Sequence, residues 1–217
     1  SYENNSIGSF VEVGAAAGVD LKSTGFSCAA TDLDHNGWPD LVVSNFRQYN
    51  KVFYNDGDGT FSFMAPATNP SQVMNLGDLV PDPAWPGAYE FASLPVGYDL
   101  TFPVRGQWSM PVEVQDFNSD GWLDIVFLSW SRQLEDNSPL SASNAMFAPW
   151  ERAHLYLNRG DQDGDGFGDG EYREVAQEVG MDHIGGCMGT VSGDFNEDGV
   201  PDLYVSGGGP QVDTQLE

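Results

Sequence analysis

Basic residues are scarce in this sequence: eight Lys and Arg stand against 33 Asp and Glu, and the formal net charge is −25. A chain with such an excess of carboxylates repels nucleic-acid phosphates and anionic membrane surfaces. The sequence also lacks any stretch that approaches about 18 consecutive apolar residues, the length that a membrane-spanning helix needs. We therefore expect no nucleic-acid partner and no insertion into a membrane.

Cysteine is almost absent, since Cys28 and Cys187 are the only two. Two cysteines are too few for a disulfide scaffold. They could pair in an oxidising compartment or lie as small buried apolar residues, and the sequence leaves both alternatives open.

Motifs of the common catalytic machineries are missing as well. There is no Gly-x-Ser-x-Gly elbow, no phosphate-binding loop and no His-Glu-x-x-His pair. His35 lies at a non-ligand position of an acidic loop, His154 opens an apolar run, and His183 precedes Cys187 with no residue nearby to orient it. We therefore expect no catalytic residue and no organic cofactor, and we predict that the protein is not an enzyme.

The sequence does contain a repeat, and enough apolar surface for a packed core, because 40% of its residues are hydrophobic. A shift of 162 residues lays residues 8–13 on residues 170–175 and Asp32 on Asp194. A middle copy begins its acidic loop at Asp116, so the copies are 84 and 78 residues apart. We expect one domain over residues 1–217, with repeats at about 14–63, 112–175 and 188–217.

Each copy has the same order of elements. A short strand leads into an acidic loop, the loop leads into a β-branched and aromatic run, and further short strands follow. Four short antiparallel strands per repeat are typical of a propeller blade, so the predicted class is all-β. The expected strands are residues 26–31, 40–44, 51–55 and 60–63 in the first copy, 112–115, 124–129 and 154–158 in the second, and 188–193 and 202–206 in the third; a fourth strand is also expected in the second copy.

Two segments between the copies show no clear period. Residues 64–111 hold eight prolines and two tryptophans, and residues 132–150 are similar but shorter. We interpret both as long loops that emerge from one end of the blades, where such loops are often functional.

The ends of the chain suggest an incomplete ring. Residues 9–13 resemble a fourth strand, and the chain stops after the second strand of its third unit. Because two complete blades cannot close a ring, we expect a partial propeller. Further blades would come from a longer protein or, as the alternative, from another chain.

The acidic loops have the spacing of calcium ligands. Side-chain oxygens fall at loop positions one, three, five and nine, and glycine at position six permits a sharp turn that lets the backbone carbonyl of position seven point inward. Ca²⁺ takes six to eight oxygen ligands, whereas Mg²⁺ keeps more water, so calcium is predicted. The expected ligands are Asp32, Asp34, Asn36, Trp38 and Asp40; Asp116, Asn118, Asp120, Trp122 and Asp124; and Asp194, Asn196, Asp198, Val200 and Asp202.

A fourth loop obeys the same spacing but lies in the hairpin between the third and fourth strands of the second copy. Without a cation its carboxylates would crowd together, so we predict a fourth calcium site. Its expected ligands are Asp161, Asp163, Asp165, Phe167 and Asp169. None of the loops is an EF-hand, because position twelve of the first three is Val43, Phe127 or Val205 rather than glutamate.

Residues 32–43, followed by Val52-Phe-Tyr-Asn-Asp-Gly-Asp-Gly-Thr-Phe61, resemble the FG-GAP/VCBS repeat. That repeat builds the β-propeller of integrin α-subunits and many secreted bacterial proteins. The phrase at 155–160 and residues 172–181 are similar to the cartilage acidic protein/UnbV branch. Repeats near 80 residues exceed the roughly 60 typical of that family. The resemblance implies a calcium-stabilised propeller but no particular biological role.

We therefore expect a secreted, extracellular or cell-surface calcium-binding propeller that serves adhesion, ligand binding or surface assembly. Its partner would be a protein or glycan held by the long loops. One alternative is the propeller domain of a secreted polysaccharide lyase-like enzyme, in which Trp85, Trp108 and Trp150 stack on sugar rings. A second alternative is a subunit of an extracellular filament.

Overall fold

A computed structural model of the chain describes residues 2–5, 8–20, 25–45, 50–63, 79–81, 89–91, 109–129, 153–176, 178–181 and 187–207. Every regular element in these ranges is a β-strand, as the all-β prediction requires. Over the same ranges no helix is long and apolar enough to cross a membrane.

Two four-stranded sheets form the body of the described chain. The first sheet contains β3 (Gly25–Thr31), β4 (Asp40–Asn45), β5 (Lys51–Asn55) and β6 (Phe61–Phe63). The second contains β9 (Ser109–Gln115), β10 (Asp124–Ser129), β11 (His154–Asn158) and β12 (Tyr172–Glu174). In both sheets the strands pair antiparallel in chain order, which is the meander of a propeller blade.

A third sheet repeats the first half of this pattern with β13 (Cys187–Gly193) and β14 (Asp202–Gly207). The pairing of first and second strands is alike in all three sheets. Asp40 pairs with Thr31, Asp124 with Gln115 and Asp202 with Gly193, and each pairing carries one register shift at its far end.

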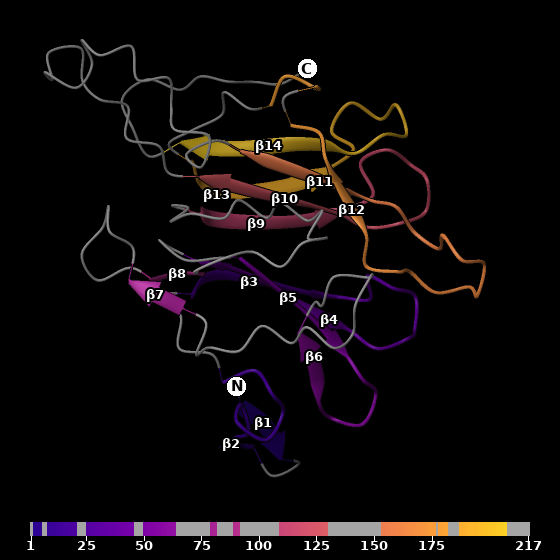
Figure 1. The fold of residues 1–217 in the computed structure, drawn as a ribbon. Helices are drawn as coiled ribbons and strands as arrows, with labels where there is room; N and C mark the ends of the chain where they lie inside the picture. The colour runs from indigo at the N-terminus through magenta and orange to yellow at the C-terminus, as the bar shows by residue number, and fades with distance from the viewer. Residues whose placement is uncertain are drawn as a thin grey trace, which may run out of the picture.

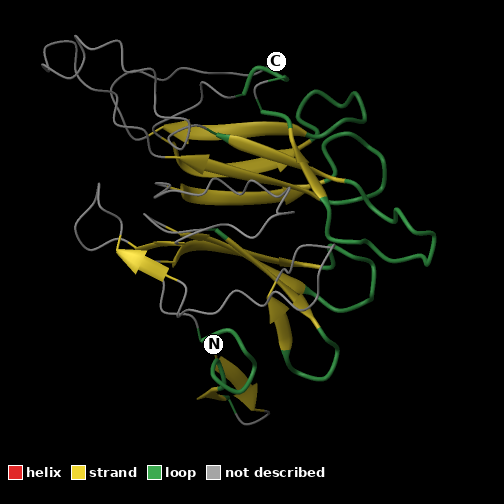
Figure 2. Ribbon diagram, viewed as in Figure 1, coloured by secondary structure: helices red, strands yellow, loops and turns green. Residues whose placement is uncertain are grey.

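The three sheets stack face to face, with the second in the middle (Figure 1). Its innermost strand β9 contacts β3 and β4 on one side and β13 on the other. The first strands of successive sheets are therefore neighbours, as they are around the axis of a propeller. Figure 2 shows that most of the described loops that join strands within these sheets lie at one end of the stack.

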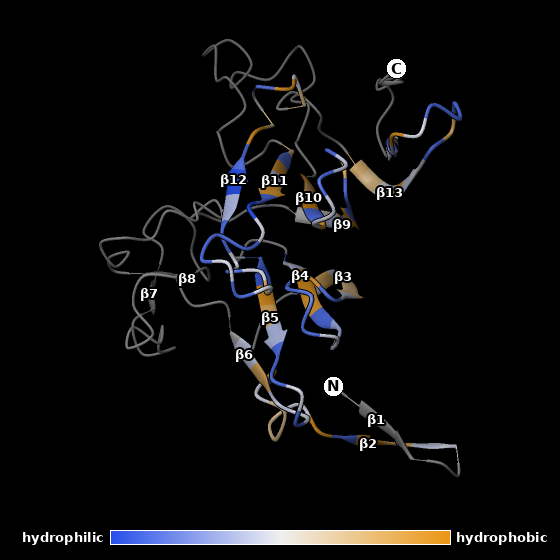
Figure 3. Cartoon of the chain, turned by 90° about the vertical axis from the view of Figure 1, so that its right-hand side faces the viewer, coloured by the Kyte–Doolittle hydropathy of each residue, from blue (hydrophilic) through white to orange (hydrophobic). Residues whose placement is uncertain are grey.

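Apolar residues fill both spaces between the sheets. Ile125 and Phe127 of β10 pack with Val42 and Val52 of the first sheet, whereas Val126 and Leu128 face the cluster that contains Cys187 of the third. Because side chains alternate along a strand, β10 supplies both layers and all six of its residues are buried. In Figure 3 the hydrophobic colour lies on parts of the strands, among them β4 and β10, and the connecting loops are mostly hydrophilic.

The structure corrects the sequence interpretation at two places. β2 (Ser9–Glu12), expected as a fourth strand, instead pairs with β1 (Tyr2–Asn5) in a hairpin turned by Gly8 at φ 81°. Its four residues are exposed, so local pairing rather than sheet packing defines it.

The segment 64–111, expected to be irregular, contains the hairpin of β7 (Leu79–Pro81) and β8 (Tyr89–Phe91) and the beginning of β9. Pro81 and Pro111 lie within strands there, and their number masked the β pattern. Residues 132–150 lie outside the described residues. The two cysteines are free: Cys28 is exposed and Cys187 is buried, and burial raises the pKa of the Cys187 thiol to about 12.

Candidate metal centres in four acidic loops

The four acidic loops occupy two kinds of place in the fold. Loops 32–40, 116–124 and 194–202 join the first and second strands of the three sheets. Loop 161–169 joins β11 to β12, the third and fourth strands of the second sheet. All four project from the same end of the stack (Figure 1).

Three hydrogen bonds between backbone N–H groups and side-chain oxygens, called the frame below, hold loop 32–40 in its conformation. The carboxylate at position nine closes the loop, because Asp40 Oδ2 accepts a bond from Leu33 N at 2.7 Å. The carboxylate at position one accepts from the glycine at position six, Gly37 N to Asp32 Oδ2, at 2.9 Å. Position five accepts from position seven, Trp38 N to Asn36 Oδ1, at 2.8 Å.

The other three loops repeat this frame. The closing bonds at position nine measure 2.9 Å for Asp124, 2.6 Å for Asp169 and 2.9 Å for Asp202. The bonds from Gly121, Gly166 and Gly199 to position one are each 2.8 Å. Those from position seven to Asp120, Asp165 and Asp198 are 2.8 to 2.9 Å. The four loops thus have the same pattern of hydrogen bonds.

The backbone explains the glycine at position six and reveals a second constraint. Gly37, Gly121, Gly166 and Gly199 have φ between 88° and 95°, the left-handed region that glycine enters freely. Position four is left-handed as well, with φ of 63° at His35, 57° at Ser119 and 63° at Glu197. A residue with a side chain pays about 1–2 kcal/mol there. The sequence held one signal of it, the glycine at position four of the fourth loop, Gly164, with φ 87°.

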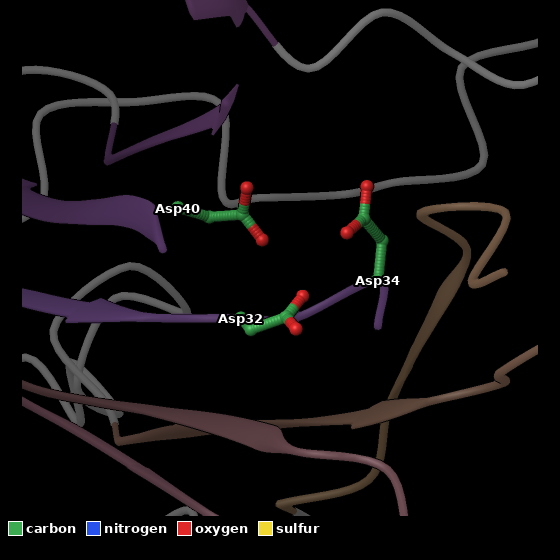
Figure 4. Close-up of side chains that lie close together, drawn as sticks. All are labelled: Asp32, Asp34 and Asp40. Carbon is green, nitrogen blue, oxygen red and sulfur yellow. The ribbon is translucent and has the colours of Figure 1, made fainter. Parts of the chain in front are cut away.

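Carboxylates converge in two of the loops. Ligand oxygens of Asp32, Asp34 and Asp40 lie within 4.8 Å of one another, and Figure 4 shows the three side chains turned toward a common space. Asp161, Asp163 and Asp169 form the same cluster. In loops 116–124 and 194–202 position three is an asparagine, Asn118 or Asn196, whose side-chain oxygen accepts a bond from position five at 3.1 or 2.9 Å.

Burial makes these carboxylates costly to ionise without a cation. Burial raises the pKa of Asp40 to about 6, against backbone N–H bonds that lower it, and the same cause raises the pKa of Asp124 to about 6. Burial also raises the pKa of Asp34, with a contribution from the charge of Asp32. In Asp161, by contrast, N–H bonds from Gly164 and Gly166 lower the pKa.

One oxygen of the first cluster has no donor. Asp32 Oδ1 is buried and has no hydrogen-bond partner. A buried polar atom of this kind needs a partner, and the other two members of the cluster, Asp34 and Asp40, are carboxylates that offer only acceptors when ionised. An oxygen-seeking divalent cation is the chemistry that fits this donor set.

Asparagines that the sequence reasoning missed hold two of the loops to their sheets. Asn55 N donates to Asp40 Oδ1 at 2.8 Å, and Asn158 N donates to Asp124 Oδ1 at 2.9 Å. The side-chain amides return to the loops, Asn55 Nδ2 to Pro39 O at 3.0 Å and Asn158 Nδ2 to Leu123 O at 3.3 Å. The signal was present as an Asn-x-Gly ending of the third strand in both copies, at 55–57 and 158–160.

The tryptophans at position seven pack on those glycines. A Cβ on Gly57 would lie 2.7 Å from Trp38 Nε1, and a Cβ on Gly160 would overlap the indole of Trp122. The structure therefore assigns both indoles a packing role beside the loops. The side chains of Phe167 and Val200, at the same position in the other two loops, are about half exposed.

A comparison with protein-family models gives one match, to the FG-GAP-like repeat, over residues 32–82 and 116–205. These ranges contain all four acidic loops and the strands of both four-stranded sheets except β3 and β9. No curated protein matches the sequence. The matched ranges cover more than half of the chain, and the antiparallel four-stranded sheets agree with them, so the chain belongs to the FG-GAP-like repeat family.

Proposed function

We propose that the chain is an extracellular calcium-binding β-propeller module in which the four acidic loops hold Ca²⁺. The observation that carries the proposal is the repetition of one nine-residue frame, with position-one and position-nine carboxylates held in place by backbone N–H groups in every loop. The orphaned Asp32 Oδ1 and the converging carboxylates of two loops support it.

The residues that would hold the cation are those at positions one, three, five and nine of each loop, with the carbonyl of position seven. A bound cation supplies positive charge to a chain in which 33 acids outnumber eight bases, and it lowers the repulsion between neighbouring carboxylates. The chain itself places the ligands before a cation binds. Backbone N–H groups orient two carboxylates of each loop, and the left-handed residues at positions four and six turn the loop.

The role of such a module is to present a rigid binding surface. Loops bound to calcium at roughly 10⁻⁴–10⁻³ M are typical of extracellular modules, where calcium is abundant. We therefore propose a secreted or cell-surface protein that serves adhesion, ligand binding or assembly, with a protein or glycan as its partner.

Thermal unfolding in calcium tests the metal proposal. Calcium that binds only the folded state stabilises it by mass action, about 2.7 kcal/mol per site at one hundred times the Kd. We expect the Tm to rise by at least several degrees between chelator and 10 mM CaCl₂. That concentration is about a hundredfold above the Kd of the tightest expected sites and about tenfold above that of the weakest. Equal ionic strength of MgCl₂ is the control, and an unchanged Tm in calcium would overturn the proposal.

A variant sharpens that test. Asp32→Asn keeps an oxygen that can accept the bond from Gly37 N but removes one charge from the cluster of Asp32, Asp34 and Asp40. Its matched control is Asp58→Asn, an exposed acid of the β5–β6 hairpin outside the four loops. The calcium-dependent part of the Tm shift should shrink in the first variant and persist in the second.

A further inference from the structure

Loop 161–169, which joins the third and fourth strands of the second sheet, touches loop 32–40 of the first sheet. Gly168, at position eight of loop 161–169, donates its N–H to the carbonyl oxygen of Asp34 at 2.8 Å. Asp34 is position three of loop 32–40, so one residue offers its side chain to the first cluster and its backbone to the neighbouring loop. In Figure 4 the ribbon of the second sheet passes beside Asp34.

This approach requires glycine. A Cβ at residue 168 would lie 3.1 Å from Asp34 Cα, 3.1 Å from Trp122 Cζ3 and 3.4 Å from Leu33 O. Those neighbours are mainly backbone and a packed ring, which cannot move aside cheaply. Gly168 does not have a left-handed φ, so close packing rather than backbone conformation explains why the position has no side chain.

Two further contacts hold loop 32–40 against the second sheet, one from the end of β11 and one from loop 116–124. Asn158 Nδ2, at the end of β11, donates to Leu33 O at 3.1 Å, and this bond is buried. The His35 ring stacks on Trp122, with centroids 4.1 Å apart and planes inclined by 14°. Positions two, three and four of loop 32–40 are therefore all held by residues of the second sheet.

We propose that loops 32–40 and 161–169 bind divalent cations as a coupled pair, with Gly168 as the positioning residue that links them. The inference rests on the proposed calcium function. Closing loop 161–169 on a cation fixes Asp169 and, with it, the adjoining Gly168 N–H that holds Asp34. Binding at either loop then favours the folded form of the other, and thermodynamic linkage requires the effect to be equal in both directions.

The coupled pair also spans the boundary between two sheets. Loop 32–40 belongs to the first sheet and loop 161–169 to the second, so cation binding at the pair should strengthen the contact between the sheets. Loop 194–202 provides the comparison, because no hydrogen bond within the described ranges joins it to loop 32–40.

Calorimetric titration with CaCl₂ measures the coupling. A background that carries Asp116→Asn and Asp194→Asn disables the other two loops and leaves the pair intact. Asp161→Asn or Asp32→Asn in that background isolates each member. We expect calcium to bind the intact pair with a product of stepwise association constants about fivefold or more above the product of the two isolated constants.

Gly168→Ala in the same background keeps every carboxylate and should reduce that ratio toward one. Gly25→Ala is the matched control, since a Cβ there meets only ordinary contacts at 3.7 and 3.8 Å, and it should preserve the ratio. Circular dichroism of each variant checks that the sheets are folded. If an Asn variant unfolds, the loss of positive cooperativity in Gly168→Ala alone decides the question.

The outcomes separate the two proposals. Two calcium ions bound independently, with a ratio of one before and after Gly168→Ala, would overturn the coupling and leave the proposed function standing. No calcium bound by the unmutated protein would overturn the proposed function and the coupling together.

Discussion

The strands β10 and β14 hold equivalent places in two copies of the repeat, yet their surroundings differ. Each begins with the aspartate at position nine of its loop, Asp124 or Asp202. All six residues of β10 are buried between two neighbouring sheets. In β14 only Leu203 and Val205 pack toward the second sheet, and Tyr204 is 57% exposed.

The difference shows that burial in a stack of sheets depends on the neighbours and not on the strand alone. Asp-Ile-Val-Phe-Leu-Ser and Asp-Leu-Tyr-Val-Ser-Gly are runs of the same length that hold four and three hydrophobic residues. β4 is intermediate, since Val42 faces the second sheet and is fully buried whereas Leu41 and Val43 are partly exposed. A stacked sheet is thus stabilised through both faces, and a strand with one packed face contributes less.

The largest expected effect is at Phe127. Its ring is fully buried and meets Tyr156 edge-on, with centroids 6.1 Å apart and planes inclined by 75°. Phe127→Ala should lower the free energy of unfolding by about 3–5 kcal/mol, because it leaves a cavity in a packed layer. Val205→Ala, at the equivalent place in β14, should cost about 1 kcal/mol. Urea unfolding of both variants measures the difference, and equal losses would contradict the comparison.

The second prediction concerns pH in metal-free protein. Burial raises the pKa of Asp40 from 3.8 to about 6. The folded state then binds more protons than the unfolded state between about pH 4 and 6, so the free energy of unfolding should fall as the pH rises through that window. The contribution is at most about 3 kcal/mol. Bound calcium should reverse the slope, since it requires ionised carboxylates.

Asp40→Asn should remove part of that slope. Unfolding by urea between pH 4 and 7, in buffer freed of calcium by a chelating resin, measures it. Asp202→Asn is the matched variant, because Asp202 closes the equivalent loop of the third sheet but is only partly buried. A slope that persists unchanged in Asp40→Asn would show that other carboxylates cause it.

Much of this architecture follows from the sequence because its signals are local. The β-branched runs after Asp40, Asp124 and Asp202 gave the strands, and the Asp-Gly spacing gave the loops. The calcium itself stays a prediction, as do the extracellular location and the finer family branch. The left-handed backbone at His35, Ser119 and Glu197 was not predicted, because the loop and not the residue type imposes it there. Its signal in the sequence was Gly164, the glycine at the same position of the fourth loop.

Contacts between distant segments could not be predicted from the sequence, for a different reason. The bond from Gly168 N to Asp34 O joins residues that no periodicity relates. The hairpins β1–β2 and β7–β8 were missed because their strands are short and, in the second case, contain proline. Local pattern thus predicts the elements and their order, whereas the contacts that couple one loop to another depend on how the sheets stack.

The smallest expected effect on the free energy of unfolding is at Tyr204. This substitution tests the comparison of β10 with β14 on the exposed face of β14. Val126 is the equivalent residue of β10 and is fully buried. Val126→Ala should cost about 1–3 kcal/mol, whereas Tyr204→Ala should change the free energy of unfolding by no more than about 0.5 kcal/mol, as surface substitutions do. Tyr204 pairs across the sheet with Val191, which is also about half exposed, so no packed layer is lost. A loss at Tyr204 as large as that at Val126 would mean that this outer face is covered in solution, and concentration dependence of the unfolding midpoint would then show whether a second copy of the chain covers it.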